Sequence, residues 1–420
     1  MTNQKNWARN YTYSAARLHQ PTTLEQVREL VKSCAKMRVL GTRHSFNGIA
    51  DSAEDMISLE HFDRIVELDH ARRTVTIESG VRYGQLGQYL HREGYALHNL
   101  ASLPHISVAG ACATATHGSG DGNGNLATAV AAMELVRADG EIVTLSRNDL
   151  REPFDGTVVS LGRLGVITKI TLNIVPTFEV RQHVYEHLPM AQLESHFEEI
   201  ESSAYSVSLF TDWQSERINQ IWLKARVSDN AATTAAPTFF EATLAPTHRH
   251  PITAISPVNC TPQMGIAGPW HERLPHFRMD YTPSSGEELQ SEYFVPREHG
   301  LAAIRKIQDM HEQISPLLFI SEIRTIAADT LWMSPCYQQP SVAIHFTWKQ
   351  NWPEVQKMLV KIEEQLMPFN ARPHWGKLFV MLPARLKSLY TKLPDFQKLL
   401  RSYDPQGKFS NEFLDTYIFD

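Results

Sequence analysis

The stretch that decides the fold reads Val39-Leu40-Gly41-Thr42-Arg43-His44-Ser45-Phe46-Asn47. A short apolar strand runs here into a turn that contains Gly, Thr, Ser and Asn, with one histidine in the middle. Such a turn presents consecutive backbone N–H groups, which suit an anion such as a pyrophosphate. His44 then lies beside whatever molecule carries the anion. From these residues alone, His44 can be a link to a cofactor, a metal ligand or a plain loop histidine.

Length and composition indicate a globular protein with two domains. The chain has 420 residues, of which 42% are hydrophobic and 20% are charged, and this length exceeds one ordinary core. The net charge of −6 argues against broad binding to nucleic acid or to anionic membranes. No apolar run reaches the roughly 18–20 residues that a membrane span needs. We therefore expect neither a nucleic-acid partner nor a membrane partner.

The N-terminus and the cysteines indicate the compartment. Residues 1–7 are polar and contain no apolar signal core. The four cysteines are widely scattered and form no CxxC pair, which indicates neither a zinc site nor a disulfide framework. We expect a reduced, cytoplasmic protein that is a monomer.

A metal site is not indicated by the 19 histidines either. The closest spacing is His248-Arg249-His250, which lies in a Pro-flanked segment without a third ligand in view. We interpret this pair as part of a surface loop and expect no metal.

The first 178 residues alternate between short strands and helices. Thr22 and Glu25 have capping-box spacing before an apolar helical face that ends at Cys34, which we interpret as a core residue. Residues 73–78 alternate as a half-buried strand does, and Asp139-Gly140 is a favoured two-residue hairpin turn. Another strand is expected over residues 168–175.

Small residues dominate the segment from Leu100 to Gly118. Such a run lets the backbone approach a flat ligand closely, because few side chain atoms hold the ligand off. The following residues, Gly118–Asn125, alternate Gly with polar residues and predict a loop. They do not match G-x-G-x-x-G after an apolar strand, so a Rossmann site is excluded.

Composition changes after Pro176. Segments with alternating polarity, such as Tyr205–Phe210 and Ile221–Val227, predict an antiparallel sheet, and the pattern over Arg297–Ile314 is helical. Leu386–Leu400 is predicted to be one helix near the C-terminus. Together these patterns indicate a second domain of the α+β class.

Two predicted strands in this second domain each carry a polar pair on one face. Glu322 and Arg324 are two residues apart, as are His345 and Thr347, so each pair shares a side of its strand. A carboxylate, a guanidinium, an imidazole and a hydroxyl suit a polyhydroxylated substrate, whose hydroxyl groups need both donors and acceptors. The alternative is a solvent-facing sheet surface with an ion pair. Arg372–Lys377 can likewise be a plain turn before a strand.

Six motifs in order identify the chain as a member of a known family. Together they resemble the alditol oxidase branch (xylitol and sorbitol oxidases) of the vanillyl-alcohol-oxidase flavoproteins, to which aldonolactone oxidases are closely related. The motifs are Gly41-Thr42-Arg43-His44-Ser45-Phe46-Asn47, Ala101-Ser102-Leu103-Pro104-His105-Ile106-Ser107-Val108-Ala109-Gly110, Ala115-Thr116-His117-Gly118-Ser119-Gly120, Glu322-Ile323-Arg324, His345-Phe346-Thr347 and His374-Trp375-Gly376-Lys377.

The resemblance implies an α+β fold with a two-part FAD-binding domain of the vanillyl-alcohol-oxidase type and an α+β cap domain built on an antiparallel sheet. It divides the chain into residues 1–178 (FAD), 179–377 (substrate cap) and 378–420 (return to the FAD domain). It also implies that His44 is bonded covalently to FAD.

The resemblance further implies which residues form the site. The FAD contacts carried over are Gly41, Thr42, Arg43, His44, Ser45, Phe46, Ser102, Ser107, Gly110, Thr114, Ala115, Thr116, His117, Ile167 and Lys377. The substrate contacts are Ser102, Glu322, Arg324, His345 and Thr347, and the catalytic set is His345, Lys377, Arg324 and Glu322. In this scheme Glu322 and Arg324 hold each other in place.

The implied reaction is oxidation of the terminal primary alcohol of an alditol to the aldose, with O2 reduced to H2O2. His345 is the expected base or its relay, and Lys377 is expected to stabilise negative charge. The alternative in the same fold is an aldonolactone oxidase or dehydrogenase, and a cofactor-free sugar-binding protein is the alternative from another class.

One residue departs from the family pattern. Some relatives have Gly directly before the histidine, where this chain has Arg43. A positive φ is costly for Arg, so we expect the local turn to differ.

Overall fold

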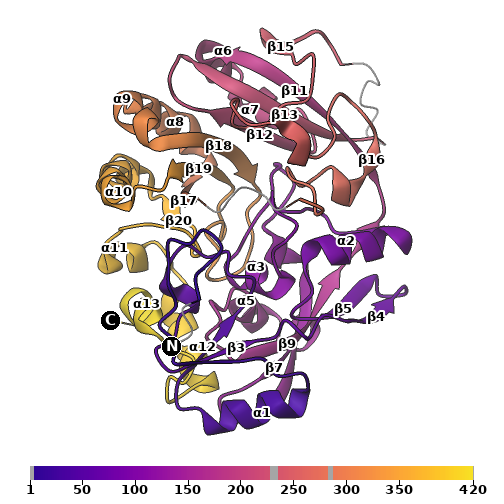
Figure 1. Ribbon diagram of the computed structural model, residues 1–420, viewed down its shortest axis with the longest axis vertical. Helices are drawn as coiled ribbons and strands as arrows, with labels where there is room; N and C mark the ends of the chain where they lie inside the picture. Colours follow the sequence, from indigo (N-terminus) through magenta and orange to yellow (C-terminus); the bar gives the residue numbers. More distant parts are fainter. Residues whose placement is uncertain (1–3, 228–234, 282–286, 420) are drawn as a thin grey trace.

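The computed structural model describes residues 4–227, 235–281 and 287–419. Figure 1 shows the N-terminal strands and the C-terminal helices together in the lower part of the molecule, with the large sheet of the middle segment above them. Segments far apart in the sequence are therefore neighbours in space. Among the described helices, none is both long and apolar enough to cross a membrane.

The N-terminal part contains two main sheets. The first is a parallel sheet with the order β1–β3–β2, and the second is an antiparallel sheet with the order β4–β5–β9–β7–β8. The bounds are β1 Arg17–His19, β2 Met37–Leu40, β3 Asp55–Ser58, β4 Ile65–Asp69, β5 Thr74–Glu78, β7 Val130–Val136, β8 Ile142–Ser146 and β9 Val166–Asn173. β6 (Tyr95–Ala96) pairs with β10 (Val175–Pro176).

The predicted hairpin is present, but its turn is longer than the two residues Asp139-Gly140, because the Arg137 N–H donates to the Glu141 carbonyl and the Gly140 N–H donates to the Arg137 carbonyl, both at 2.9 Å. β7 and β8 pair with Val136 opposite Ile142, and Gly140 in the turn has a φ of 82°. Glycine adopts this left-handed conformation without the steric cost that a Cβ brings. The strand expected over residues 168–175 is β9 followed by β10.

The predicted N-cap of the first helix is off by one residue. α1 covers Leu24–Ser33, and its N-cap is Thr23 rather than Thr22, with Gln26 rather than Glu25 closing the capping box. Both pairs have the same spacing, but helical backbone begins at Leu24, which makes Thr23 the flanking residue. The other helices are α2 Tyr83–Arg92, α3 Val108–Ala113, α4 Arg147–Leu150 and α5 Glu152–Val158.

The middle segment forms one large, mainly antiparallel sheet, as predicted. Its order is β14–β15–β11–β13–β12–β18–β19–β17–β20, with β16 beside β11. The bounds are β11 Glu179–Pro189, β12 Ser206–Thr211, β13 Arg217–Arg226, β14 Thr238–Phe239, β15 Ala242–Leu244, β16 Gly268–Pro269, β17 Glu288–Pro296, β18 Leu318–Ile326, β19 Ser341–Lys349 and β20 Arg372–Pro373.

Helices cover one side of this sheet. Ile304 of α8 and Leu359 of α10 belong to the same buried cluster as Ile323 and Ile344, which are strand residues of β18 and β19. The bounds are α6 Met190–Ser195, α7 Phe197–Glu201, α8 Gly300–Gln308, α9 His311–Ile314 and α10 Trp352–Leu366. The helical pattern predicted over Arg297–Ile314 is thus divided into a 3₁₀ turn, α8 and α9.

The prediction of a single helix over Leu386–Leu400 is wrong. The structure has α11 (Pro383–Ser388) and α12 (Leu393–Tyr403) instead, followed by α13 (Glu412–Leu414). Pro394 lies in the first turn of α12, where its missing N–H is tolerated, but it would break a helix that ran through it.

The C-terminal helices pack against the N-terminal part. Phe396 and Leu400 lie in the same buried cluster as Leu161 and Phe154, and the Met37 N–H donates to the Lys408 carbonyl at 2.9 Å. The cluster under the large sheet is separate from this one. The division into residues 1–178, 179–377 and 378–420 stays a prediction, because the first cluster also contains Trp270 and Trp375 and the second also contains Phe46.

Candidate active site

Two adjoining cavities lie where the N-terminal part meets the large sheet. Their volumes are about 590 and 570 Å³. Both are lined by Gly41–His44, Ser107 and Gly110, so they share one wall. The first cavity also reaches the polar faces of β18 and β19, whereas the second extends towards Gly80 and Ile167.

The turn that contains His44 is held in place from the far end of the chain. The Phe46 N–H donates to the Gly376 carbonyl at 2.8 Å. The Asn47 amide donates to the carbonyls of Trp375 (2.9 Å) and Lys377 (2.8 Å). The sequence motifs at 41–47 and 374–377 therefore form one structural unit.

The His44 ring stacks on Trp7, with ring centroids 5.5 Å apart and an interplanar angle of 22°. Its Nδ1 lies 3.1 Å from the Thr42 hydroxyl. Burial, together with the neighbouring His105, lowers the pKa of His44 to about 4. The imidazole is therefore unprotonated near neutral pH and keeps a lone pair for bond formation.

Arg43 adopts the conformation that we expected it to avoid. Its φ is 62°, so the turn keeps a left-handed residue at this position and the expectation of a different turn is wrong. The Trp7 N–H donates to the Arg43 carbonyl at 2.8 Å. This contact and the exposed position of the side chain explain how the turn tolerates a residue other than Gly, at a cost of about 1–2 kcal/mol.

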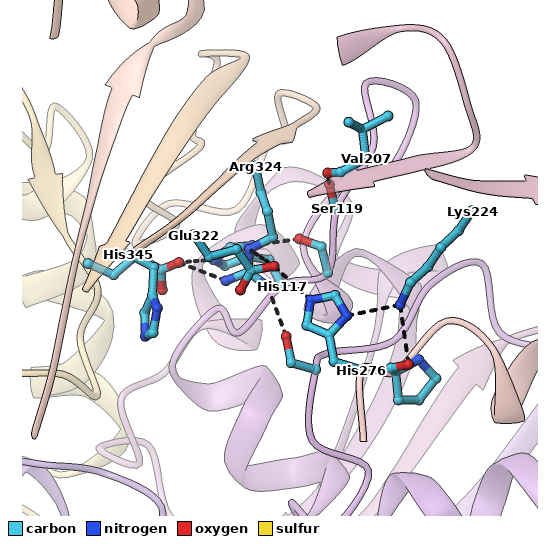
Figure 2. A network of polar contacts seen from close by, with 12 residues as sticks. His117, Ser119, Val207, Lys224, His276, Glu322, Arg324 and His345 are labelled. Carbon is cyan, nitrogen blue, oxygen red and sulfur yellow. Dashed lines mark hydrogen bonds and ion pairs between the residues drawn. The ribbon is translucent and has the colours of Figure 1, made fainter. Parts of the chain in front are cut away.

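The polar pairs of β18 and β19 form a row across the sheet. Glu322 lies opposite His345, and His345 lies opposite Glu292 of β17. Figure 2 shows Glu322, Arg324 and His345 in one network of polar contacts. Glu322, Arg324, His345 and Thr347 are all at most 8% exposed, which excludes the solvent-facing alternative.

Glu292 is the centre of this network, and sequence reasoning missed it. Its Oε1 accepts from Arg324 at 2.8 Å and lies 3.1 Å from His117 Nε2, and its Oε2 accepts from Lys377 at 2.7 Å. Gln290 lies two residues before it and faces the same cavity. This spacing of polar residues, the same as for Glu322 and Arg324, is the signal that could have found them.

Glu322 and Arg324 were expected to hold each other in place, but each of them has a closer partner elsewhere. They lie 3.5 Å apart, but the closest partner of Glu322 is His276 (2.7 Å) and that of Arg324 is Glu292 (2.8 Å). The reason is that residues two apart on a strand point the same way without facing each other, whereas neighbouring segments approach them head-on.

The charges of the network determine which groups are ionised. Burial by itself would raise the pKa of Glu292, but Lys377, His117 and Arg324 lower it well below its usual range. Burial would likewise raise the pKa of Glu322, and Arg324 and His276 lower it instead. Burial and Lys377 lower the pKa of His345 to about 3. Two carboxylates therefore face a neutral imidazole in the cavity wall.

The structure brings nearly all the predicted site residues to the two cavities. The first is lined by Gly41, Thr42, Arg43, His44, Ser45, Phe46, Ser102, Ser107, Gly110, Thr114, Thr116, His117, Glu322, Arg324, His345, Thr347 and Lys377. Ile167 lines the second. Ala115 lines neither, because it is buried behind the wall with a φ of 54°. No strand follows Lys377 in the part of the chain that the structure describes.

Comparison with known proteins gives the family. A family model described as FAD binding domain matches residues 15–146, and one described as D-arabinono-1,4-lactone oxidase matches residues 283–417. The alditol oxidase of a Streptomyces species is 45% identical over 412 residues, which cover 97% of each chain. The chain belongs to the alditol oxidase family.

More distant relatives share the whole length of the chain. The L-gulonolactone oxidase of Mus musculus is 25% identical over 99% of this chain and 98% of its own. The L-gulono-1,4-lactone dehydrogenase of Mycobacterium tuberculosis is 26% identical over 97% of each chain. A crystal structure of cholesterol oxidase from B. sterolicum has a TM-score of 0.77 at 17% identity, and the match covers 99% of this chain and 96% of that one. This neighbour confirms the predicted fold of the vanillyl-alcohol-oxidase type.

FAD is the cofactor of this family member, and the cavities fit it. FAD is a long molecule with a flat ring system at one end, and the two adjoining cavities form one elongated site around the His44 turn. A Cβ built on Gly110 would lie 2.8 Å from the Ser107 hydroxyl oxygen, so glycine lets the backbone and Ser107 come together at this wall. The sequence analysis expected such a close approach from the small-residue run.

A further group of potential ligands lies outside the cavities. Ligand atoms of His19, Cys34 and Asp55 lie within 4.8 Å of one another. Asp55 already accepts from Arg17 at 2.7 Å with both oxygens and lies 2.7 Å from His19 Nε2. Since Arg17 neutralises the carboxylate, we interpret the group as a structural ion-pair network. Cys34 is buried against the apolar side of α1, as expected.

Proposed function

We propose that this chain oxidises the terminal primary alcohol of alditols such as xylitol and sorbitol to the aldose, with FAD as cofactor and O2 reduced to H2O2. The observation that carries the proposal is that one cavity contains both the His44 turn and the buried polar row of Glu322, Arg324 and His345. A polyol offers several hydroxyl groups, and a dry site must match each of them with a donor or an acceptor.

We assign the binding of the distal hydroxyl groups to Glu322, Arg324, Thr347 and Ser102. The carboxylate accepts hydrogen bonds, the guanidinium donates them, and the two hydroxyl groups do either. Arg324 also lies 3.4 Å from the Ser102 hydroxyl, which links the cap face to the FAD side. An analogue without these hydroxyl groups would leave buried polar groups unpaired.

His345 is the proposed base for the alcohol proton. The Gln290 amide donates to Glu288 at 2.6 Å, so its oxygen faces His345 Nε2 at 3.2 Å and accepts the ring N–H. Nδ1 of His345 therefore carries the lone pair that receives the proton. When bound, FAD supplies the hydride acceptor for the alcohol carbon.

Lys377 is the proposed electrostatic stabiliser. Its ammonium lies 2.7 Å from Glu292 Oε2, and the turn that follows His374 holds its backbone, with the Lys377 N–H donating to the His374 carbonyl at 3.1 Å. A fixed cation at the cavity wall stabilises negative charge that develops on the alcohol oxygen or next to it. Burial lowers the pKa of Lys377, and Glu292 counteracts this effect.

We also propose that His44 is bonded covalently to FAD. The unprotonated ring and its place in the wall shared by both cavities support this assignment. Replacement of His44 by Ala should release the flavin into the supernatant after acid precipitation, whereas the wild-type pellet stays yellow. His61→Ala, a change at an exposed histidine, is the matched control. A yellow His44→Ala pellet would refute the covalent link, and a colourless wild-type protein would favour a cofactor-free sugar-binding protein.

The second candidate is an aldonolactone oxidase or dehydrogenase. It is favoured by the family model described as D-arabinono-1,4-lactone oxidase over residues 283–417, which include the whole polar row. A peroxide assay over xylitol, sorbitol and gulono-1,4-lactone separates the two functions. Peroxide from the lactone alone would overturn the alditol assignment, and turnover only with an artificial acceptor would indicate a dehydrogenase.

We further propose that the protein acts as a monomer in the cytoplasm, without a nucleic-acid or membrane partner. Its four cysteines are free and buried, as in proteins of reducing compartments, and its net charge of −6 disfavours anionic partners. Light scattering on the eluting holoenzyme should give the monomer mass of 47.7 kDa, and fractionation of cells should recover peroxide-forming activity in the cytoplasm.

A further inference from the structure

A buried lysine lies behind the substrate face, outside the mechanism described so far. Lys224 is near the C-terminal end of β13 and is 0% exposed. Its Nζ lies 3.0 Å from His276 Nδ1 and 3.2 Å from the Pro275 carbonyl, and it also donates to the Leu274 carbonyl. Figure 2 shows Lys224 in contact with His276, in the same network as Glu322. The three hydrogens of the ammonium thus have three acceptors.

The lysine determines which nitrogen of His276 carries the ring hydrogen. An ammonium group only donates, so Nδ1 of His276 must accept. The ring hydrogen of the neutral imidazole is then on Nε2, which lies 2.7 Å from Glu322 Oε1. Burial and the adjacent Lys224 lower the pKa of His276 to about 4, in agreement with a single ring hydrogen.

His276 is also fixed in orientation. Its backbone N–H and that of Phe277 both donate to the Ser102 carbonyl, at 3.1 and 3.3 Å. Its ring makes edge contacts with Trp222 (5.1 Å between centroids) and Phe210 (5.5 Å). The residue therefore connects the FAD side, through Ser102, with the substrate face, through Glu322.

We propose that Lys224 and His276 are positioning residues, which hold the Glu322 carboxylate as an ionised acceptor for a polyol hydroxyl group. His276 and Arg324 both contact Oε1 of Glu322, and Glu322 also lines the first cavity, so we assign Oε2 to the polyol hydroxyl group. Because Lys224 occupies Nδ1, His276 donates to Glu322 without becoming a cation itself. The inference rests on the proposed function, since it gives Glu322 a hydroxyl group to bind.

The tautomer of His276 is the first test. Holoenzyme with ¹⁵N-labelled histidine is measured by NMR at pH 6, where Lys224, whose pKa burial lowers to about 7, is protonated. We expect the His276 signals of a neutral ring with hydrogen on Nε2, assigned by their loss in His276→Gln. Hydrogen on Nδ1, or on both nitrogens, in the wild-type protein would overturn the proposal. This measurement needs neither substrate nor a lysine variant.

A double-mutant cycle is the second test. In Lys224→Met, the loss of the neighbouring cation lets His276 take up a second proton, which neutralises Glu322 in an ion pair. We expect the KM for xylitol to rise about tenfold, with kcat changed less than threefold. In the His276→Gln background, the amide still donates to Glu322 but cannot be protonated, so Lys224→Met should change KM less than twofold.

The outcomes separate the inference from the proposed function. Equal effects of Lys224→Met on KM in both backgrounds would overturn the positioning role, and so would a wild-type KM in Lys224→Met. Lys398→Met, a change at an exposed lysine, is the control, and the NMR result decides if Lys224→Met does not fold. If the wild-type protein oxidises no alditol, the proposed function fails, while the tautomer of His276 still tests the link between Lys224, His276 and Glu322.

Discussion

The two halves of the site are built in opposite ways. The His44 turn is a continuous stretch of nine residues, 39–47, of which residues 39–46 line the first cavity. The substrate face is a row of single residues on three strands, namely Glu322, His345 and Glu292. The turn depends on local conformation, whereas the row depends on strand register.

This difference has an electrostatic consequence. The His44 turn contains one exposed cation, Arg43, and a neutral histidine. The row, together with Arg324 and Lys377, concentrates two carboxylates, a guanidinium and an ammonium in a buried space, where each charge must be balanced by a partner. A change in the row should therefore have large effects, and a change in the turn should have small ones unless it removes His44.

The largest expected effect is on turnover. His345→Ala removes the proposed base, so kcat for xylitol should fall about 10²- to 10⁴-fold, while the flavin stays bound. The measurement is a peroxide-coupled assay, normalised to flavin absorbance, with His61→Ala as the matched control. Wild-type turnover in His345→Ala would remove the residue from the mechanism.

The next effect is on stability. Glu292→Leu leaves the Arg324 and Lys377 cations and the His117 ring without their shared partner, and Glu292 itself is 1% exposed. We expect the free energy of unfolding to fall by about 3–5 kcal/mol, measured by urea denaturation. Glu93→Leu, at an exposed position, should stay within about 0.5 kcal/mol of wild type. A loss below about 1 kcal/mol in Glu292→Leu would mean that the row does not depend on this charge.

A third test uses pH. The folded-state pKa of His345 is about 3, below its unfolded value, so the unfolded chain binds a proton first as the pH falls. The associated stability is complete above about pH 6.5 and is lost below it. We therefore measure how far the free energy of unfolding falls between pH 6.5 and pH 4.5. The fall should be about 2 kcal/mol smaller in His345→Asn than in the wild-type protein. Identical losses in the two proteins would show that folding does not lower the pKa of His345.

The smallest expected effect is in the turn. Arg43→Gly removes the cost of a left-handed Arg but increases the freedom of the unfolded chain. These terms nearly cancel, so the free energy of unfolding should change by less than about 1 kcal/mol, with activity unchanged. Arg43→Val, with a β-branched side chain at φ 62°, should be destabilised by about 1–2 kcal/mol. Equal melting temperatures for Gly and Val would show that φ at this position is not constrained.

Local patterns in the sequence were enough for much of the fold. The hairpin at Asp139-Gly140, the antiparallel strands of the middle segment and the shared faces of Glu322 with Arg324 follow from turn chemistry and from the period of a strand, and each is present. The N-cap was misplaced at Thr22 because Thr22 and Thr23 both satisfy the capping-box spacing. Residues 386–400 were predicted as one helix because the helix-breaking effect of Pro394 was underestimated.

The family motifs suggested site residues that local patterns alone do not indicate, and their roles remain proposals. Composition and spacing left His44 open between a cofactor link, a metal ligand and a loop residue. The ordered set of motifs, with their resemblance to alditol oxidases, selected the first. The 45% identity to an alditol oxidase then confirmed the family.

Only the tertiary structure showed what holds these residues in place. Glu292, His276 and Lys224 belong to none of the sequence motifs. Glu292 contacts Arg324, and His276 contacts Glu322, in each case at least 30 residues away in the sequence. Lys224 reaches Glu322 only through His276. Their roles arise from strand register and from segments that meet across the domain boundary. The sequence by itself predicted a turn around His44, because turn propensity depends on neighbouring residues, whereas contacts from Trp7 and from residues 375–377 hold its conformation. Which charged groups meet behind the substrate face was decided by the tertiary structure, because the ionisation of a buried group depends on its partners in space.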